Sequence, residues 1–169
     1  METKRLDIET HLILSRWAKT TIVTETEYTV EQLQDMADFY YENDNLSAPV
    51  ASGSVKWDGM IVAPCSMKTL ACIASGYTEG LVARAADVAI KERRRLVLLT
   101  RECPLNPIHL ENMLNLTRLG VTIMPPVPAF YTRPETVEDI VNQTVGRTLD
   151  QFGLEIDILK RWGGGYYGR

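Results

Sequence analysis

Two short polar runs follow apolar segments of the chain, and their residue types suit phosphate binding. Ser66-Met67-Lys68-Thr69 comes directly after the apolar run Gly59–Pro64, and Arg101-Glu102 comes after Leu96–Thr100. A serine that caps a helix leaves free backbone N–H groups at the positive end of the helix dipole, where an anion is stabilised. The alternatives are a capping serine beside a solvated lysine, and a surface ion pair between Arg101 and Glu102.

Three further cations have spacings that allow them to bind an anion. Arg84 and Lys91 are separated by two helical turns, so both side chains project from one helix face. The alternative for this pair is a solvated basic stripe that continues through Arg93-Arg94-Arg95. Arg147 lies near an apolar helical stripe, where a charge is disfavoured unless it is paired. We expect it in a ligand crevice, at a subunit contact, or with its head group in solvent.

The elements that would position these residues alternate between strand and helix. Four apolar runs have the length of buried strands: His11–Ser15, Gly59–Pro64, Leu96–Thr100 and Val121–Met124. Helical periods are predicted over 30–40, 67–75, 81–92 and 108–119, and in a last helix that Pro134 opens. The order predicts a doubly wound parallel α/β sheet with its ligand crevice at the carboxyl ends of the strands. Ser15 and Tyr131 also follow predicted strands, whereas Thr24–Tyr28 is predicted as a solvated loop.

Composition limits the class of protein. The 169 residues are 45% apolar and predict one domain over residues 1–162, with a flexible Gly/Tyr tail over 163–169. A net charge of −4 gives no general attraction to nucleic acid, and no apolar run is long enough for a membrane span. Cys65, Cys72 and Cys103 lack the spacing of metal ligands, so no metal site is expected. Reduced thiols indicate the cytoplasm, or a mitochondrion in a eukaryote.

Several motifs, taken together and in order, resemble the flavin prenyltransferases of the UbiX type. The similarity runs from about Glu9 to Trp162, and Trp17-Ala18-Lys19-Thr20-Thr21 resembles members formerly named as components of phenolic or aromatic acid decarboxylases. The motifs that carry the resemblance are Ser52-Gly53-Ser54, Pro64-Cys65-Ser66-Met67-Lys68-Thr69-Leu70, Arg84-Ala85-Ala86-Asp87-Val88, Lys91-Glu92, Arg101-Glu102, His109-Leu110-Glu111-Asn112-Met113 and Pro128-Ala129-Phe130-Tyr131.

The resemblance implies a Rossmann-like flavoprotein that forms homo-oligomers, either trimers or dodecamers, with FMN at the subunit contacts. It implies transfer of a dimethylallyl group from dimethylallyl phosphate to N5 and C6 of reduced FMN without a metal. The product, prenylated FMN, would serve a partner UbiD-type decarboxylase of aromatic or unsaturated acids.

The resemblance also assigns roles to individual residues. Those matching FMN-contacting positions are Ser15, Ser66, Met67, Lys68, Thr69 and Arg101. Those matching the group that holds the substrate phosphate are Arg84, Lys91, Tyr131 and Arg147. The implied catalytic group is Glu102 as acid/base, Glu25 and Ser54. Cations that compensate a departing phosphate and an acid that protonates it suit this chemistry.

One feature departs from the family pattern. Members of this family begin with a strand and a Gly-Ala-Ser-Gly-like loop, whereas this chain starts at the equivalent of their second strand, so we expect the first β-α unit to be absent. The alternative function is therefore an N-terminally truncated, non-catalytic FMN-binding accessory subunit of an aromatic-acid decarboxylase. A related class that oxidatively decarboxylates cysteine-ended substrates typically needs an active-site histidine. His11 and His109 fit the prenyltransferase pattern better.

Overall fold

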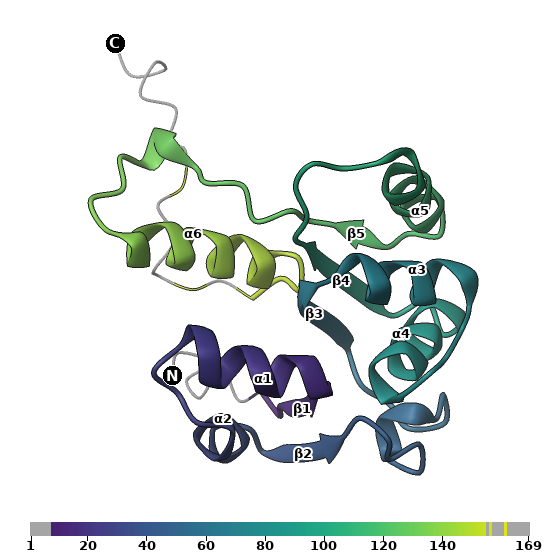
Figure 1. The fold of residues 1–169 in the computed structure, drawn as a ribbon. Coiled ribbons are helices and arrows are strands. Elements are labelled where there is room, and N and C mark those ends of the chain that lie inside the picture. Colours follow the sequence, from purple (N-terminus) through teal and green to yellow (C-terminus); the bar gives the residue numbers. More distant parts are fainter. Residues whose placement is uncertain (1–7, 155, 157–160, 162–169) are drawn as a thin grey trace.

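The computed structural model describes residues 8–154, 156 and 161 (Figure 1). The predicted tail over 163–169 and the domain boundary at 162 lie outside these residues. The elements in chain order are β1 (His11–Leu14), α1 (Arg16–Glu25), α2 (Val30–Met36), β2 (Phe39–Glu42), the 3-10 turn η2 (Pro49–Ala51), β3 (Gly59–Cys65), α3 (Met67–Ser75), α4 (Leu81–Lys91), β4 (Arg95–Thr100), α5 (Pro107–Arg118), β5 (Thr122–Ile123), the 3-10 turn η3 (Phe130–Thr132) and α6 (Val137–Asp150).

All strand pairs described are parallel, which confirms the predicted α/β class. One sheet has the order β3-β4-β5, and β1 and β2 form a second sheet. The two sheets share a supporting layer, because Ile13 of β1 and Met60 of β3 pack against one apolar cluster that includes Leu81 and Ala85 of α4. Helix α4 therefore joins the two sheets.

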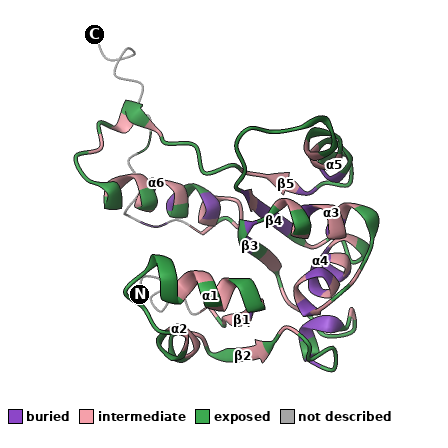
Figure 2. Cartoon of the chain, viewed as in Figure 1, coloured by how far each residue is buried: buried purple, intermediate pink, exposed green. Residues whose placement is uncertain are grey.

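The main core lies around β3 and β4. Leu96 and Leu98 of β4 are almost wholly buried and pack with Leu70 of α3, Ala86 of α4 and Leu116 of α5. Figure 2 shows the buried residues concentrated on β4 and α4. This packing fixes the carboxyl ends of β3 and β4 and hence the turns that follow them.

The N-terminal part differs from the prediction in two elements. Residues Arg16–Glu25 form helix α1 although no residue of it is buried, so the sequence carries no strong apolar period there. Phe39–Glu42 forms strand β2, although the predicted helical period extends through Tyr40. The strand exists because His11 of β1 pairs with Phe39 and supplies a parallel partner. Glu25 is consequently the last residue of a helix, so the predicted loop over Thr24–Tyr28 is wrong for Thr24 and Glu25, whereas Thr26–Tyr28 form an exposed loop as predicted.

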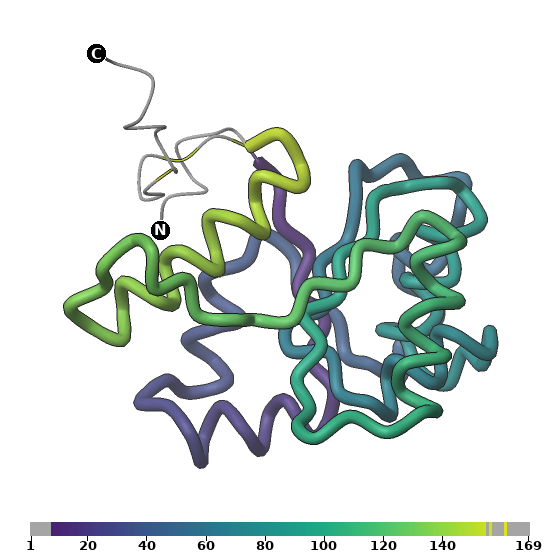
Figure 3. Tube along the Cα trace, turned by 90° about the horizontal axis from the view of Figure 1, so that it is seen from above, coloured from purple at the N-terminus to yellow at the C-terminus, as the bar shows by residue number. Residues whose placement is uncertain are grey.

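The last helix also differs in its start and in its environment. Thr136, not Pro134, caps α6, because its hydroxyl accepts a hydrogen bond from the backbone of Asp139 at 3.1 Å. Val137 and Val141, in the predicted apolar stripe, are 78% and 51% exposed. In both Figure 1 and Figure 3, α6 lies on the opposite side of β3 and β4 from α5.

Two features are absent from the described part of the chain. None of its helices combines the length and apolar character that crossing a bilayer requires. No group of three His, Cys, Asp or Glu side chains among the same residues is placed to hold a metal ion.

Candidate functional site

The carboxyl ends of β3 and β4 bring two of the predicted polar runs together. Cys65 pairs with Thr100 in the sheet, and the backbone N–H of Arg101 donates to the Cys65 carbonyl at 3.2 Å. Ser66 caps α3, and its Oγ accepts from the backbone N–H of Thr69 at 3.3 Å. The start of α3 and Arg101 are therefore neighbours at one edge of the sheet, as the strand positions predicted.

This edge has the donors that a phosphate needs. The first N–H groups of a helix lack carbonyl partners within the helix, and Lys68 in the first turn of α3 is exposed beside them. Arg101 and Glu102 are exposed next to this turn, and Glu102 Oε1 accepts from the backbone N–H of Cys103 at 3.2 Å. Directly before the turn, burial raises the pKa of the Cys65 thiol to about 12, so this thiol stays neutral and unreactive.

A second polar group lies at the carboxyl ends of β1 and β2. Ser15 caps α1, and its Oγ accepts from the backbone N–H of Ala18 at 3.1 Å. Lys19 Nζ donates to both carboxylate oxygens of Glu42, at 2.8 and 2.7 Å, and these hydrogen bonds lower the pKa of Glu42. This ion pair was not predicted from the sequence, because strand β2 was not expected. Glu25 is exposed at the far end of α1, about 15 Å along the helix from Ser15.

Arg84 and Lys91 lie on α4, beside the loop that carries Ser54. Arg84 donates through Nε to the Ala51 carbonyl at 3.1 Å and through Nη1 to Asp87 at 2.6 Å. Lys91 forms an ion pair with Glu92 and lowers its pKa. The Ser52-Gly53-Ser54 loop lies directly against this pair, because a Cβ on Gly53 would collide with the Lys91 ammonium and the Glu92 carboxylate. Within the loop, the Ser52 and Ser54 hydroxyls are 2.8 Å apart.

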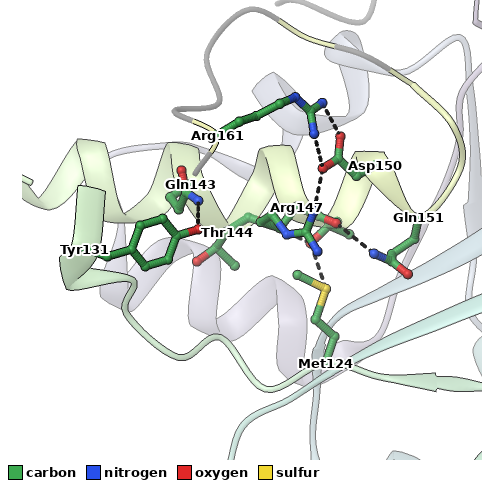
Figure 4. A network of polar contacts seen from close by, with 9 residues as sticks. Met124, Tyr131, Gln143, Thr144, Arg147, Asp150, Gln151 and Arg161 are labelled. Carbon is green, nitrogen blue, oxygen red and sulfur yellow. Dashed lines mark hydrogen bonds and ion pairs between the residues drawn. The ribbon is translucent and has the colours of Figure 1, made fainter. Parts of the chain in front are cut away.

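Tyr131 and Arg147 lie together on a third part of the molecule, shown in Figure 4. The amide of Gln143 on α6 donates to the Tyr131 hydroxyl at 3.1 Å. One turn further along α6, Arg147 Nη1 donates to Asp150 at 2.7 Å. Arg147 therefore lies one helical turn from Gln143, the residue that donates to the phenol.

Lys91 and Arg101 do not converge within one chain. Lys91 comes shortly before the first residue of β4 and Arg101 directly after its last. Six residues of extended strand separate these two points by about 20 Å. The sequence predicted the cations but not their carboxylate partners Asp87 and Asp150, although the spacing of three residues along a helix is a recognisable signal.

Comparison with known proteins agrees with the fold. Residues 3–149 match the family described as Flavoprotein. The parallel sheets and this match define the chain as a flavoprotein.

Individual proteins with high sequence identity to this chain identify its family within the flavoproteins. A probable UbiX-like flavin prenyltransferase from Escherichia coli O157:H7 is 58% identical over 158 residues, which cover 94% of this chain and 80% of that protein. The chain belongs to the family of UbiX-like flavin prenyltransferases, which confirms the resemblance. The chain spans about four fifths of this relative, and the expected absence of a first strand and glycine loop stays a prediction.

Two solved structures have nearly the same fold. The structure of AnUbiX (PadA1) in complex with FMN and dimethylallyl pyrophosphate has a TM-score of 0.94 and 53% identity, covering 95% of this chain and 86% of that one. The dodecameric FMN-dependent Ubix-like decarboxylase from Escherichia coli O157:H7 has a TM-score of 0.93 and 56% identity, covering 95% and 87%.

Proposed function

We propose that this protein transfers a dimethylallyl group from dimethylallyl phosphate to reduced FMN. The main support is the start of α3 beside Arg101, an anion-binding arrangement in a chain 53% identical to a protein solved with FMN and dimethylallyl pyrophosphate. Reduced FMN would supply the nucleophilic atoms that accept the prenyl group. The other groups that we assign to the reaction are side chains and backbone donors of the protein.

The residues present fit the phosphate of FMN. The free N–H groups of α3 and the hydroxyls of Ser66 and Thr69 provide neutral donors, and Lys68 and Arg101 provide positive charge. Ser15 holds an equivalent position at the end of β1. We therefore assign Ser15, Ser66, Met67, Lys68, Thr69 and Arg101 to FMN binding.

The substrate phosphate requires cations, and Lys91 lies about 20 Å from Arg101 of this edge in the same chain. Arg84, Lys91 and Arg147 would compensate the charge of the departing phosphate, and Tyr131 would donate a hydrogen bond to it. Glu102 would deliver a proton, and Glu25 and Ser54 complete the proposed catalytic group. The separation of Lys91 and Arg101 within one chain supports a homo-oligomer in which a second copy completes the site. We propose a trimer or a dodecamer, and the similar Escherichia coli protein is described as dodecameric.

The direct test is anaerobic incubation of the purified protein with reduced FMN and dimethylallyl phosphate. We expect the flavin to gain the mass of one C5H8 unit and inorganic phosphate to be released in equal amount. Intact protein that binds reduced FMN but gives no mass gain would contradict the proposal. Arg118→Ala is a suitable control, because Arg118 is exposed at the end of α5 and none of the proposed groups lies on that helix.

The same assay addresses the alternative of a non-catalytic accessory subunit. Turnover by the purified chain without any partner protein rejects that alternative. The proposed recipient of the product is a UbiD-type decarboxylase, which should gain activity when it is mixed with the reaction products. The free thiols Cys65, Cys72 and Cys103 support the cytoplasm as the proposed compartment.

A further inference from the structure

One carboxylate at the end of α6 is shared by two guanidinium groups (Figure 4). Asp150 Oδ1 accepts from Arg161 Nη2 at 2.8 Å, and Oδ2 accepts from Arg161 Nη1 at 3.0 Å and from Arg147 Nη1 at 2.7 Å. The Asp150 side chain is only 11% exposed, whereas those of Arg147 and Arg161 are half exposed. The hydrogen bonds from Arg161, and to a smaller extent those from Arg147, lower the pKa of Asp150, so the carboxylate is ionised at neutral pH.

This arrangement differs from that of the other two cations proposed to bind the phosphate, Arg84 and Lys91. Among the described ion pairs, Asp87 has one cationic partner, Arg84, and Glu92 has one, Lys91. If Arg84 turns toward a phosphate, Asp87 loses its ion-pair partner, and the lost interaction opposes binding. If Arg147 turns away from Asp150, both carboxylate oxygens keep their hydrogen bonds to Arg161.

We propose that Arg161 is a positioning residue for the substrate phosphate, because its two bonds to Asp150 neutralise that carboxylate and leave the Arg147 guanidinium available to the phosphate. The inference rests on the phosphate-binding role assigned to Arg147 above. Without Arg161, the partly buried Asp150 would keep Arg147 as its remaining ion-pair partner at this position. The phosphate would then have to compete with the Asp150 carboxylate for the Arg147 guanidinium. No sequence pattern indicates this role, because Arg161 lies beyond the helix that carries Arg147.

The test compares Arg161→Ala with Arg161→Lys in the full-length protein. For Arg161→Ala we expect KM for dimethylallyl phosphate to rise about 10-fold, the factor expected for one charge-assisted hydrogen bond, with a much smaller change in kcat. Titration with inorganic phosphate should show the same loss of affinity. Arg161→Lys keeps the positive charge, so it should recover part of the lost phosphate affinity. Arg118→Ala should leave both values unchanged.

A double variant distinguishes positioning from a merely structural contribution. In an Asp150→Asn background the competing carboxylate is gone, so Arg161→Ala should cause no further loss of phosphate affinity. An equal loss in both backgrounds, or an unchanged phosphate affinity in Arg161→Ala, would overturn the inference. The thermal midpoint of the ligand-free Arg161→Ala protein should fall only slightly, because an ion pair of a half-exposed arginine contributes little to stability. A large drop together with an equal loss in both backgrounds assigns Arg161 a structural role instead.

The outcomes also separate this inference from the proposed function. If the wild-type protein binds phosphate but forms no prenylated flavin, the proposed function fails, and the phosphate titrations still decide the role of Arg161. If flavin is prenylated and the Arg161 variants bind phosphate normally, the function stands and the inference is overturned. Wild-type protein that binds neither inorganic phosphate nor dimethylallyl phosphate contradicts both.

Discussion

The side-chain amide of Gln143 donates a hydrogen bond to the hydroxyl of Tyr131 over 3.1 Å, which ties the turn η3 to the middle of α6. Gln143 is 6% exposed, whereas Tyr131 is 52% exposed, so the two ends of this bond have different access to water. This asymmetry makes the two partners unequal in their effect on stability.

Tyr131→Phe should lower the free energy of unfolding by about 1–2 kcal/mol, because the buried Gln143 amide loses its acceptor. Gln143→Leu should cost less, because the half-exposed Tyr131 hydroxyl can bond to water and leucine is itself apolar. Urea denaturation of both variants measures the difference. A larger loss for Gln143→Leu would contradict the assignment of the buried end of the bond to Gln143.

Gly53→Ala should impair substrate binding more than folding. The new Cβ would displace the ends of the Lys91 and Glu92 side chains, which are long and can move. We expect a stability change of about 0.5 kcal/mol or less, as for an ordinary surface substitution. KM for dimethylallyl phosphate should rise severalfold, because the Lys91 ammonium would be displaced from the position in which it binds the phosphate. Val55→Ala, at an exposed position of the same loop and outside the proposed groups, is the matched comparison and should leave KM unchanged.

Glu102→Gln and Arg101→Ala should affect different steps. Glu102→Gln should abolish prenyl transfer while FMN remains bound, because its proposed role is to deliver a proton. Arg101→Ala should instead reduce the amount of FMN retained after gel filtration, because it removes a cation from the FMN-binding edge. Flavin absorbance per protein and the mass of the flavin product report the two effects separately. Unchanged flavin occupancy in Arg101→Ala would reject its assignment.

The three thiols should differ strongly in reactivity. Cys103 is exposed, Cys72 is partly buried and Cys65 is buried with its pKa raised to about 12. Because the thiolate is the reactive form, iodoacetamide at about pH 8 should modify Cys103 first and Cys65 only after unfolding. Peptide mass spectrometry over time gives the order. Early modification of Cys65 in the folded protein would show that the end of β3 opens to solvent.

Acid should weaken the end of α6 through Asp150. The Arg161 and Arg147 guanidiniums lower the pKa of Asp150 in the folded protein below its ordinary value of 3.8. The unfolded chain therefore binds this proton more readily, so the stabilisation is present above the ordinary value and is lost as the pH falls through the folded pKa. The stability difference between the wild type and Asp150→Asn should narrow as the pH falls through and below 3.8 in urea denaturation. A difference that does not change with pH would contradict this interpretation.

The sequence alone determined the elements whose signals are local. The apolar runs of β3 and β4 and the capping residue Ser66 lie where they were predicted, because a cap or a buried strand is specified by a few consecutive residues. From these elements the phosphate-suited edge beside Arg101 followed, because parallel strands end together.

Only the tertiary structure decided which side chains meet across long separations. Phe39–Glu42 is a strand because β1 pairs with it, and Lys19 meets Glu42 only after that pairing forms. Arg161 and Asp150 likewise meet in the folded chain although no helical spacing relates them. Local sequence selects caps and periods, whereas hydrogen bonds and ion pairs between distant segments depend on the free energy of the whole packed chain.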